Sequence, residues 1–182
     1  PNCSTILLVV ALWPLHRAAG LRGVVVSTYQ AASGAGHLAM RELRAATAAA
    51  LQGEAFAAKV LPQSLGFNLF PRVDVFQPDG YTKEEDKLLL ETRKIMALPD
   101  LPVEATCVRV PVGRCHSEAV TAWFLRELSP AAARALLQDA PGVEVIDDPE
   151  HDRYPMPLPQ SGKDLVAVGR LRYAIYLLAS LA

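Results

Sequence analysis

The run GVVVSTY at residues 23–29 constrains the fold more than any other segment of the chain. It is apolar, rich in β-branched side chains and free of charge, which is typical of a buried strand. Segments with helical spacing flank it at residues 4–19 and 37–51, and a glycine follows each of them. A buried strand between two helices predicts a domain in which helices cover a sheet.

The remaining segments continue this alternation. Thr82 is followed three residues later by Glu85, which is the pattern of a capping box and predicts a helix over residues 82–96. Ser129 and Pro130 predict the start of a further Ala-rich helix. Short extended segments are expected within residues 66–76, and strands at 104–112, 118–127, 143–146 and 165–171. This order predicts an α+β domain with a mixed β-sheet and helices packed on one face.

Composition narrows the class of protein. The chain has 182 residues, of which 51% are hydrophobic, enough for one domain with a substantial core. Its formal net charge of -1 predicts no global attraction to nucleic acid or to a membrane surface. The apolar run at residues 6–13 is too short to span a bilayer, and no signal segment precedes it. Three cysteines at spacings that suit no zinc site predict a reduced, cytoplasmic protein without a metal.

A candidate nucleophile stands near the start of the chain. Cys3 comes one residue before the first predicted helix, where unpaired N–H groups and the helix dipole favour a thiolate. A thiolate at this position can attack an acyl carbon, and the same N–H groups can stabilise the resulting oxyanion. A lone cysteine is more often a small buried residue, so position alone leaves both interpretations open.

Two further candidates lie in residues 109–118. His116 falls between two predicted strands, and a thiol enzyme commonly uses histidine as its acid or base; a solvated loop histidine is the alternative. Arg109 is flanked by valines, so its guanidinium needs an anion, either a substrate carboxylate or an internal salt bridge. Pro111 and Gly113 interrupt the strand, so spacing does not fix which face each side chain takes.

Taken together, the segments resemble aspartate-semialdehyde dehydrogenases over roughly residues 1–172. The matching segments occur in the family's order: PNCST at 1–5, STYQAASGAG at 27–36, FNLFPRVDVF at 67–76, YTKEEDK at 81–87, ETRKI at 91–95, ATCVRVPV at 105–112, HSEAV at 116–120, PMPLPQSGK at 155–163 and VGRLR at 168–172. The resemblance implies a catalytic and dimerisation domain, with a fold like the C-terminal domain of glyceraldehyde-3-phosphate dehydrogenase. Residues 173–182 are apolar and predict a buried helix, either a remnant of the last family helix or the start of unrelated sequence.

The resemblance also implies roles for individual residues in catalysis. Cys3 resembles the nucleophile that forms a thioacyl intermediate, and His116 resembles the acid/base. Gln30 is similar to the residue that orients the substrate, and Arg109 to the arginine that binds the substrate α-carboxylate.

Two pairs of residues complete the site that the resemblance implies. Glu84 and Lys87 share a helix face and resemble the partners of the substrate amino group and phosphate. An exposed helix ion pair, worth only ~0.3–0.5 kcal/mol, is the alternative. Ser33 and Gly34 resemble the turn that lies against the nicotinamide, and a simple turn that leads into a helix is the alternative.

The implied reaction is the NADPH-dependent reductive dephosphorylation of L-aspartyl-4-phosphate to L-aspartate 4-semialdehyde, in lysine, threonine and methionine biosynthesis, by a homodimer. No Gly-rich dinucleotide fingerprint is present, so we expect the main NADP-binding domain to be absent and these residues alone to be inactive as a reductase. One alternative is a non-catalytic dimerisation or interaction fragment of the same family. The other is an enzyme like N-acetyl-glutamyl-phosphate reductase, which Asn2 and Ser4 beside the cysteine disfavour.

Overall fold

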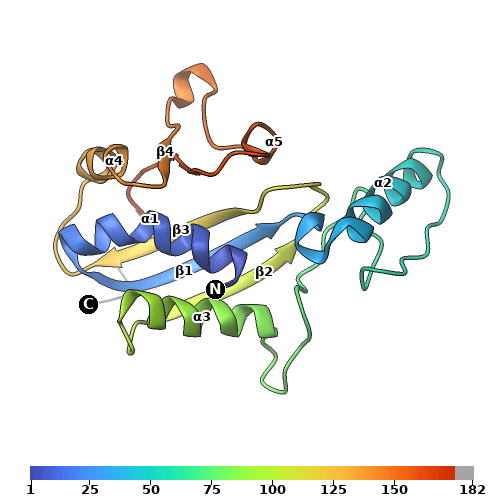
Figure 1. The fold of residues 1–182 in the computed structure, drawn as a ribbon, viewed down its shortest axis with the longest axis horizontal. Helices are drawn as coiled ribbons and strands as arrows, with labels where there is room; N and C mark the ends of the chain where they lie inside the picture. The colour runs from blue at the N-terminus through green and yellow to red at the C-terminus, as the bar shows by residue number, and fades with distance from the viewer. Residues whose placement is uncertain (175–182) are drawn as a thin grey trace.

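The computed structural model describes residues 1–174, and its centre is a three-stranded mixed sheet (Figure 1). The strands are β1 (Leu21–Gln30), β2 (Val103–Arg109) and β3 (Ser117–Phe124), in the order β2-β1-β3. The central strand β1 pairs parallel with β2 and antiparallel with β3. The β-branched run that the sequence singles out is therefore the middle strand, which has a neighbour on both sides.

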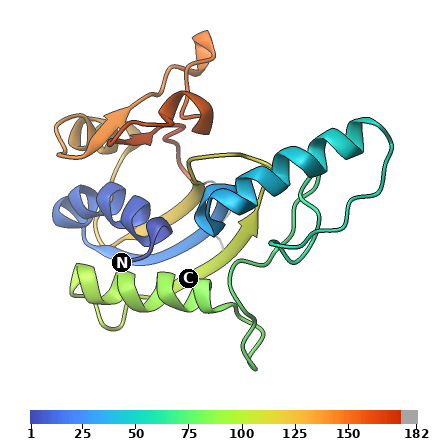
Figure 2. The same cartoon turned by 45° about the vertical axis from the view of Figure 1, so that its right-hand side comes forward.

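Two helices, α1 (Cys3–Ala19) and α3 (Lys83–Met96), lie on the same side of this sheet (Figures 1 and 2). Val24 and Val26 of β1 are 2% and 1% exposed beneath them, whereas Val25 and Tyr29 on the other face are 41% and 43% exposed. The predicted mixed sheet with helices on one face is confirmed. The other face of β1 presents apolar side chains to the surface.

The capping box predicted at the start of α3 is present. The backbone N–H of Thr82 donates to Glu85 Oε2 at 2.6 Å, and the backbone N–H of Glu85 donates to the Thr82 hydroxyl. Glu85 Oε1 also accepts the backbone N–H of Cys107 in β2 at 2.8 Å. The cap therefore fixes both the start of the helix and its position against the sheet.

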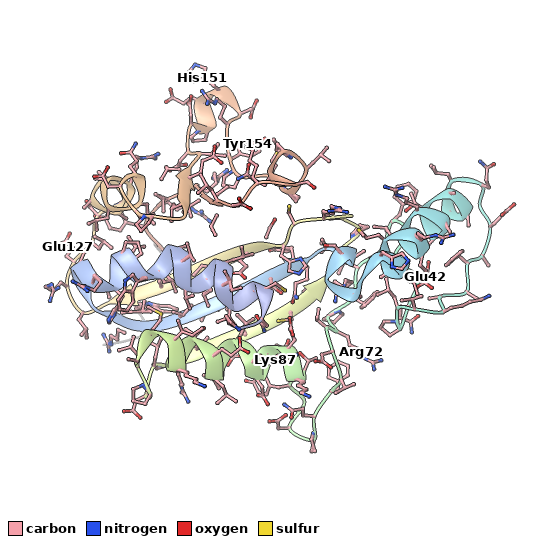
Figure 3. The ribbon with its side chains drawn as sticks, viewed as in Figure 1. Glu42, Arg72, Lys87, Glu127, His151 and Tyr154 are labelled. Atoms are coloured by element: carbon pink, nitrogen blue, oxygen red, sulfur yellow. The ribbon has the colours of Figure 1, made fainter. Side chains whose placement is uncertain are left out.

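A short 3₁₀ helix, η1 (Ala32–Ala35), leads from β1 into α2 (His37–Leu51), which projects from the end of the sheet (Figure 1). The side chain of Glu42 in α2 accepts backbone N–H groups of residues 59–61 at 2.7, 2.8 and 2.9 Å. This carboxylate, labelled in Figure 3, holds the loop that follows α2. Residues 66–76, predicted as extended, form only the isolated bridges Phe70–Arg109 and Phe76–Thr82.

The C-terminal strands do not join the central sheet, although the sequence predicted one mixed sheet. Within residues 1–174, strands β4 (Val143–Val145) and β5 (Val166–Val168) pair only with each other, in parallel. They accompany α4 (Pro130–Gln138), η2 (Pro149–His151) and α5 (Pro157–Gln160). Leu137 and Val143 cluster with Leu15 of α1, so this part packs on α1 and does not extend the central sheet.

Two further findings concern the whole described chain. The helix predicted over residues 173–182 falls, apart from its first two residues, outside the described residues. Within residues 1–174, no helix has the length and apolar character needed to cross a membrane.

Candidate functional site

The ends of two parallel strands bring the predicted site residues together. Gln30 is the last residue of β1 and Arg109 the last residue of β2, and the two are register partners. His116 comes directly before β3, which pairs with the other side of β1. Because parallel neighbours end at the same edge, Gln30, Arg109 and His116 gather at one end of the sheet.

His116 and Arg109 are both held by the main chain of Ala31. The Ala31 N–H donates to His116 Nδ1 at 3.0 Å, and the Ala31 carbonyl accepts Arg109 Nη1 at 2.7 Å. Burial, followed by the positive charge of Arg109, lowers the pKa of His116 from its ordinary value. Burial also lowers the pKa of the Arg109 guanidinium, which the charge of Glu84 partly offsets. The buried arginine that the sequence predicted is confirmed, at 5% exposure.

Gly34 lies against both side chains. A Cβ at this position would stand 3.0 Å from His116 Nε2 and 3.2 Å from Arg109 Nη1. The two nitrogen atoms therefore come within reach of one point, although seven sequence positions separate the residues. The loop through Pro111 and Gly113 makes this convergence possible, because it breaks the alternation of a continuous strand.

A chain of polar contacts runs from the sheet to α3. Thr28 donates its hydroxyl to Gln30 Oε1 at 2.9 Å, and Gln30 Nε2 donates to Glu84 Oε1 at 3.1 Å. Lys87 Nζ then reaches Glu84 at 3.3 Å and Asp74 at 2.9 Å. Gln30 is 1% exposed and Glu84 7% exposed. The buried amide of Gln30 therefore has a fixed orientation, with its oxygen toward Thr28 and its nitrogen toward Glu84.

Glu84 and Lys87 form an ion pair, as the alternative interpretation of the sequence predicted. The pair is not fully exposed, however. Glu84 is buried and shared with Gln30, whereas Lys87 stands at the start of α3 toward the surface (Figure 3). The hydrogen bond to Asp74 raises the pKa of Lys87, and the same contact lowers the pKa of Asp74. Lys87 is therefore a cation at neutral pH and can meet an anion.

Cys3 is the first residue of α1 and is exposed. The Asn2 side chain caps the helix by accepting the Thr5 N–H at 2.7 Å, and the Asn2 N–H donates to Glu91 of α3 at 2.7 Å. These contacts fix the turn that carries the thiol. Cys3 interacts electrostatically with Glu84 and with Arg109, which places it at the same end of the sheet.

The expectation of a thiolate favoured at Cys3 is wrong in its direction. Partial desolvation of the thiol by the protein around it, followed by the negative charge of Glu84, raises the pKa of Cys3 above its ordinary value. The N–H groups of Ser4 and Cys3 itself lower it, as a helix start should, but by less. The sequence could not reveal this outcome, because Glu84 is 81 positions away in the chain.

Ser33 and Gly34 lie in η1, which leads directly into α2. The Ser33 N–H donates to the Gly113 carbonyl at 3.1 Å, the Gly34 N–H to Ala31 at 3.2 Å and the Gly36 N–H to Ser33 at 2.9 Å. A dinucleotide diphosphate is normally held by free N–H groups of such a turn. These groups are already bonded, so the turn does not fit the diphosphate of NADP.

Sequence reasoning missed three residues around this site. Ala31 contributes only its main chain, and no pattern of side chains marks it. Asp74 belongs to the FNLFPRVDVF segment, and its contact with Lys87 depends on the fold. Glu118 follows His116 in β3, where burial raises its pKa to about 8. Its Oε1 is buried without a hydrogen-bond partner among residues 1–174.

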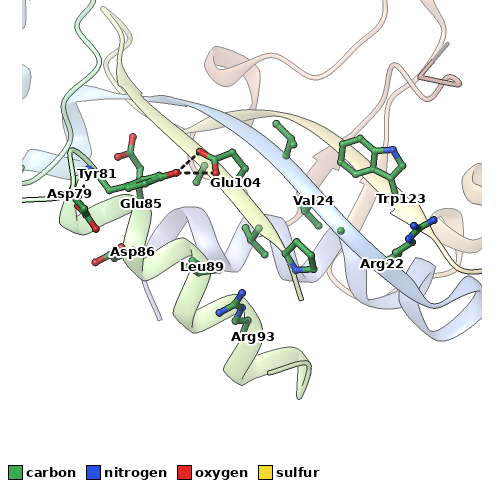
Figure 4. Close-up of a pocket in the computed structure, with 15 residues that line it drawn as sticks. Arg22, Val24, Asp79, Tyr81, Glu85, Asp86, Leu89, Arg93, Glu104 and Trp123 are labelled. Carbon is green, nitrogen blue, oxygen red and sulfur yellow. Dashed lines mark hydrogen bonds between the residues drawn. The ribbon is translucent and has the colours of Figure 1, made fainter. Parts of the chain in front are cut away.

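A separate groove lies away from these residues. It encloses about 720 Å³ and is lined by the starts of β1 and β2, by α3 and by Trp123 (Figure 4). None of the predicted site residues lines it. Within the described residues, no group of three or more His, Cys, Asp or Glu side chains could hold a metal ion.

Comparisons with known proteins identify the family of the chain. A family model described as "Semialdehyde dehydrogenase, dimerisation domain" matches residues 12–180. The aspartate-semialdehyde dehydrogenase of Aquifex aeolicus is 51% identical over 173 residues, which cover 94% of this chain and 51% of that protein. The chain thus spans about half the length of the curated relatives it matches.

Comparison with solved structures points to the same family. An aspartate semialdehyde dehydrogenase II from Vibrio cholerae, complexed with ASA, has a TM-score of 0.92 and 39% identity, covering 96% of this chain and 52% of that one. An enzyme of the same name from Candida albicans, solved with NADP, is 24% identical with a TM-score of 0.65, covers 93% of this chain and 46% of that one, and shares the fold. The chain therefore belongs to the semialdehyde dehydrogenase dimerisation-domain family.

Proposed function

We propose that this chain carries the catalytic and dimerisation part of an aspartate-semialdehyde dehydrogenase, and that its own chemistry is the acylation of Cys3 by L-aspartyl-4-phosphate. The observation that carries the proposal is the convergence of His116 Nε2 and Arg109 Nη1 beside Gly34, at the sheet end where Cys3 begins α1. Gln30 and Glu84 stand at the same end. A nucleophile, hydrogen-bond donors and a carboxylate-binding group are what acyl transfer from an amino-acid phosphate requires.

Each charged group of the site suits one group of the substrate. The buried guanidinium of Arg109 can bind the α-carboxylate with two parallel hydrogen bonds. The Glu84 carboxylate can take the α-ammonium, and Lys87 can take the phosphate. An acetylated amino acid has no ammonium for Glu84, so the site favours aspartyl phosphate over the N-acetyl-glutamyl phosphate of the rival reductase.

The acylation step balances within these residues and the substrate. The Cys3 thiol loses its proton and its sulfur forms a C–S bond to the acyl carbon, while the C–O bond to phosphate breaks; phosphate leaves with the electron pair and takes up the proton. Where NADPH is bound, its reduced nicotinamide would supply the hydride that converts the thioester to the semialdehyde. Residues 1–174 do not fit its diphosphate, so we assign no step of this chain to the cofactor and expect no reductase turnover from these residues alone.

Mass spectrometry of the chain after incubation with L-aspartyl-4-phosphate tests this proposal. We expect one aspartyl adduct per chain on Cys3, released phosphate in equal amount, and no adduct in Cys3→Ser. Cys115→Ser should acylate like the wild-type chain. Absence of the adduct, or equal labelling by N-acetyl-glutamyl phosphate, would contradict the proposal. Sustained oxidation of NADPH would contradict the expected lack of turnover.

The alternative of a non-catalytic interaction fragment has one observation in its favour. The raised pKa of Cys3 leaves the thiol protonated at neutral pH when no substrate is bound. A fragment of this kind would associate with itself or with a full-length relative and would not become acylated. The adduct on Cys3 therefore separates the two functions.

We also propose that two copies pair through the open face of the sheet. That face exposes Val25 and Tyr29. The neighbouring groove carries both signs of charge, since Arg22, Arg93, Asp79 and Glu104 are among the residues that line it (Figure 4). A surface with both signs can complement itself about a twofold axis. The match to a dimerisation-domain family supports this arrangement.

The three free cysteines suit a reducing compartment, and we propose the cytoplasm.

A further inference from the structure

We propose that Thr28 is a positioning residue for the acylation of Cys3: its hydroxyl, inside the sheet, holds the side-chain amide of Gln30 in the orientation that the substrate meets. This inference rests on the proposed function and extends it to a residue behind the site. Thr28 precedes Gln30 by two positions in β1, so the two side chains leave the strand on the same face. Thr28 is 0% exposed, so it acts through Gln30 and does not touch the substrate.

The fold restricts the direction of the Thr28 hydroxyl. Strands β2 and β3 flank the residue, with Cys107 and Glu118 as its register partners, and the buried hydroxyl cannot turn to bulk water. A β-branched side chain also has few χ1 rotamers. The hydrogen bond that Thr28 donates to Gln30 Oε1, 2.9 Å long, is therefore fixed by the position of Thr28 in the sheet.

The two contacts of the Gln30 amide favour the same orientation. A carboxylate oxygen accepts, so Glu84 Oε1 meets the nitrogen Nε2 at 3.1 Å, while Thr28 supplies the hydrogen that Oε1 of Gln30 accepts. A flipped amide would place its oxygen against the Glu84 carboxylate, and two acceptors that face each other in a buried place are unfavourable. Contacts at both ends hold the plane of the amide, whereas Glu84 alone would hold only the nitrogen.

This orientation determines what Gln30 offers to the substrate. An amide nitrogen carries two hydrogens, and the contact with Glu84 uses one of them. The second can meet a substrate oxygen beside Arg109, which is the register partner of Gln30. The same contact steadies Glu84, whose other oxygen meets Lys87 at 3.3 Å. Groups that act on a substrate must be accurately placed before it binds, so loss of the Thr28 hydroxyl should slow acylation.

Three substitutions test this role through the acylation rate of Cys3. Thr28→Val removes the hydroxyl with little change of shape, and we expect it to acylate at least about tenfold more slowly than the wild-type chain. Thr28→Ser keeps the hydroxyl and should stay within about threefold of the wild-type rate. Thr92→Val is the matched control, because Thr92 is also 0% exposed and its hydroxyl has no hydrogen-bond partner among residues 1–174. Equal rates in Thr28→Val and Thr92→Val, or equal losses in Thr28→Val and Thr28→Ser, would overturn the proposal.

Hydrogen exchange of the Gln30 side-chain amide reports its positioning without any substrate, and NMR of the chain with ¹⁵N-labelled glutamine measures it. We expect the Gln30 amide protons to be protected in the wild-type chain and in Thr28→Ser, and to exchange at least about tenfold faster in Thr28→Val. Gln160 is the internal control, because its amide donates to Glu144 at 3.0 Å in another part of the fold and should exchange at the same rate in all three chains.

The wild-type chain decides the question if Thr28→Val does not fold. Gln30 should then exchange far more slowly than Gln52, which is exposed, and equal exchange of the two amides would overturn the proposal. If the wild-type chain does not acylate, the proposed function fails, while the exchange rates still decide whether Thr28 holds Gln30.

Discussion

At the scale of single residues, Gly34 packs closely against two side chains of the site. Its φ is not positive, so alanine can adopt the same backbone. The nearest atoms to the new Cβ would be those of the His116 ring and the Arg109 guanidinium, at 3.0 to 3.2 Å. We expect Gly34→Ala to slow the acylation of Cys3 by about tenfold to a hundredfold, because it displaces groups that must be accurately placed. The measurement is the rate of adduct formation by mass spectrometry.

Gly113→Ala is the matched control for this substitution. Gly113 also lacks a positive φ, and a Cβ there would meet nothing within 4 Å. Its acylation rate and its melting temperature should equal those of the wild-type chain. Equal rates in Gly34→Ala and Gly113→Ala would show that the nitrogens do not converge at Gly34.

Cys3 gives a second prediction at this scale. Its raised pKa means that the rate of alkylation by iodoacetamide should continue to rise as the pH passes 9.0. Cys107 is fully buried with a pKa of about 12, so it should react at least about tenfold more slowly than Cys3 in the folded chain. A plateau in the rate of Cys3 below pH 8 would show that the helix start outweighs Glu84. Urea should remove the difference between the two cysteines.

The buried carboxyl of Glu118 should make the stability of the whole domain depend on pH. Its folded-state pKa of about 8 lies above the ordinary 4.5, so the folded chain holds a proton that the unfolded chain releases above that pH. The free energy of unfolding therefore falls as the pH rises from 4.5 to 8, by at most about 1.4 kcal/mol per pH unit. Glu118→Gln should remove this decline and stabilise the domain at pH 8 by on the order of 2 kcal/mol. Urea unfolding across this range measures both, and an unchanged slope would contradict the assignment.

The residues of the site show where sequence reasoning stops. Cys3, Gln30, Arg109 and His116 carry recognisable side-chain chemistry, and their ordered motifs identified them together. The main-chain contacts of Ala31 and the charge of Glu84 near Cys3 arise only when distant segments meet in the fold. This is why the presence of a thiol could be predicted and the direction of its pKa could not.

At the scale of helices and strands, local signals predicted most of the fold. The GVVVSTY run became the central strand, and the capping box at Thr82 begins α3 as expected. The separate pairing of β4 with β5 was not predictable, because it depends on α4 packing against α1. The strand predicted over 104–112 ends at Arg109, since the Val112 N–H turns back to the Val110 carbonyl.

The cap of α3 gives a prediction at this scale. Thr82→Ala removes the hydroxyl that accepts the Glu85 N–H, and Glu85 also holds Cys107 of β2. We expect a loss of about 1 kcal/mol in the free energy of unfolding, measured with urea. Thr82→Ser retains the hydroxyl and should lose clearly less. Equal losses in both variants would indicate that the threonine methyl group, and not the cap, provides the stability.

At the scale of the whole molecule, the two faces of the sheet have different uses. One face is buried beneath α1 and α3, whose starts carry Cys3 and Glu84 to the end of the strands. The other face leaves apolar side chains of β1 exposed. A central strand with an uncovered apolar face is costly in water, and a second copy of the chain would bury it without obstructing the site.

Val25→Asp tests this use of the open face. A carboxylate at the centre of the proposed interface would face its own copy across the twofold axis, and burial of two like charges opposes pairing. We expect the wild-type chain to be a dimer and Val25→Asp a monomer by size-exclusion chromatography with light scattering. Leu158→Asp places the same charge on α5, where the side chain is 85% exposed, and should remain dimeric. Circular dichroism confirms that Val25→Asp is folded, and a folded dimer in this variant would move the interface away from the open face.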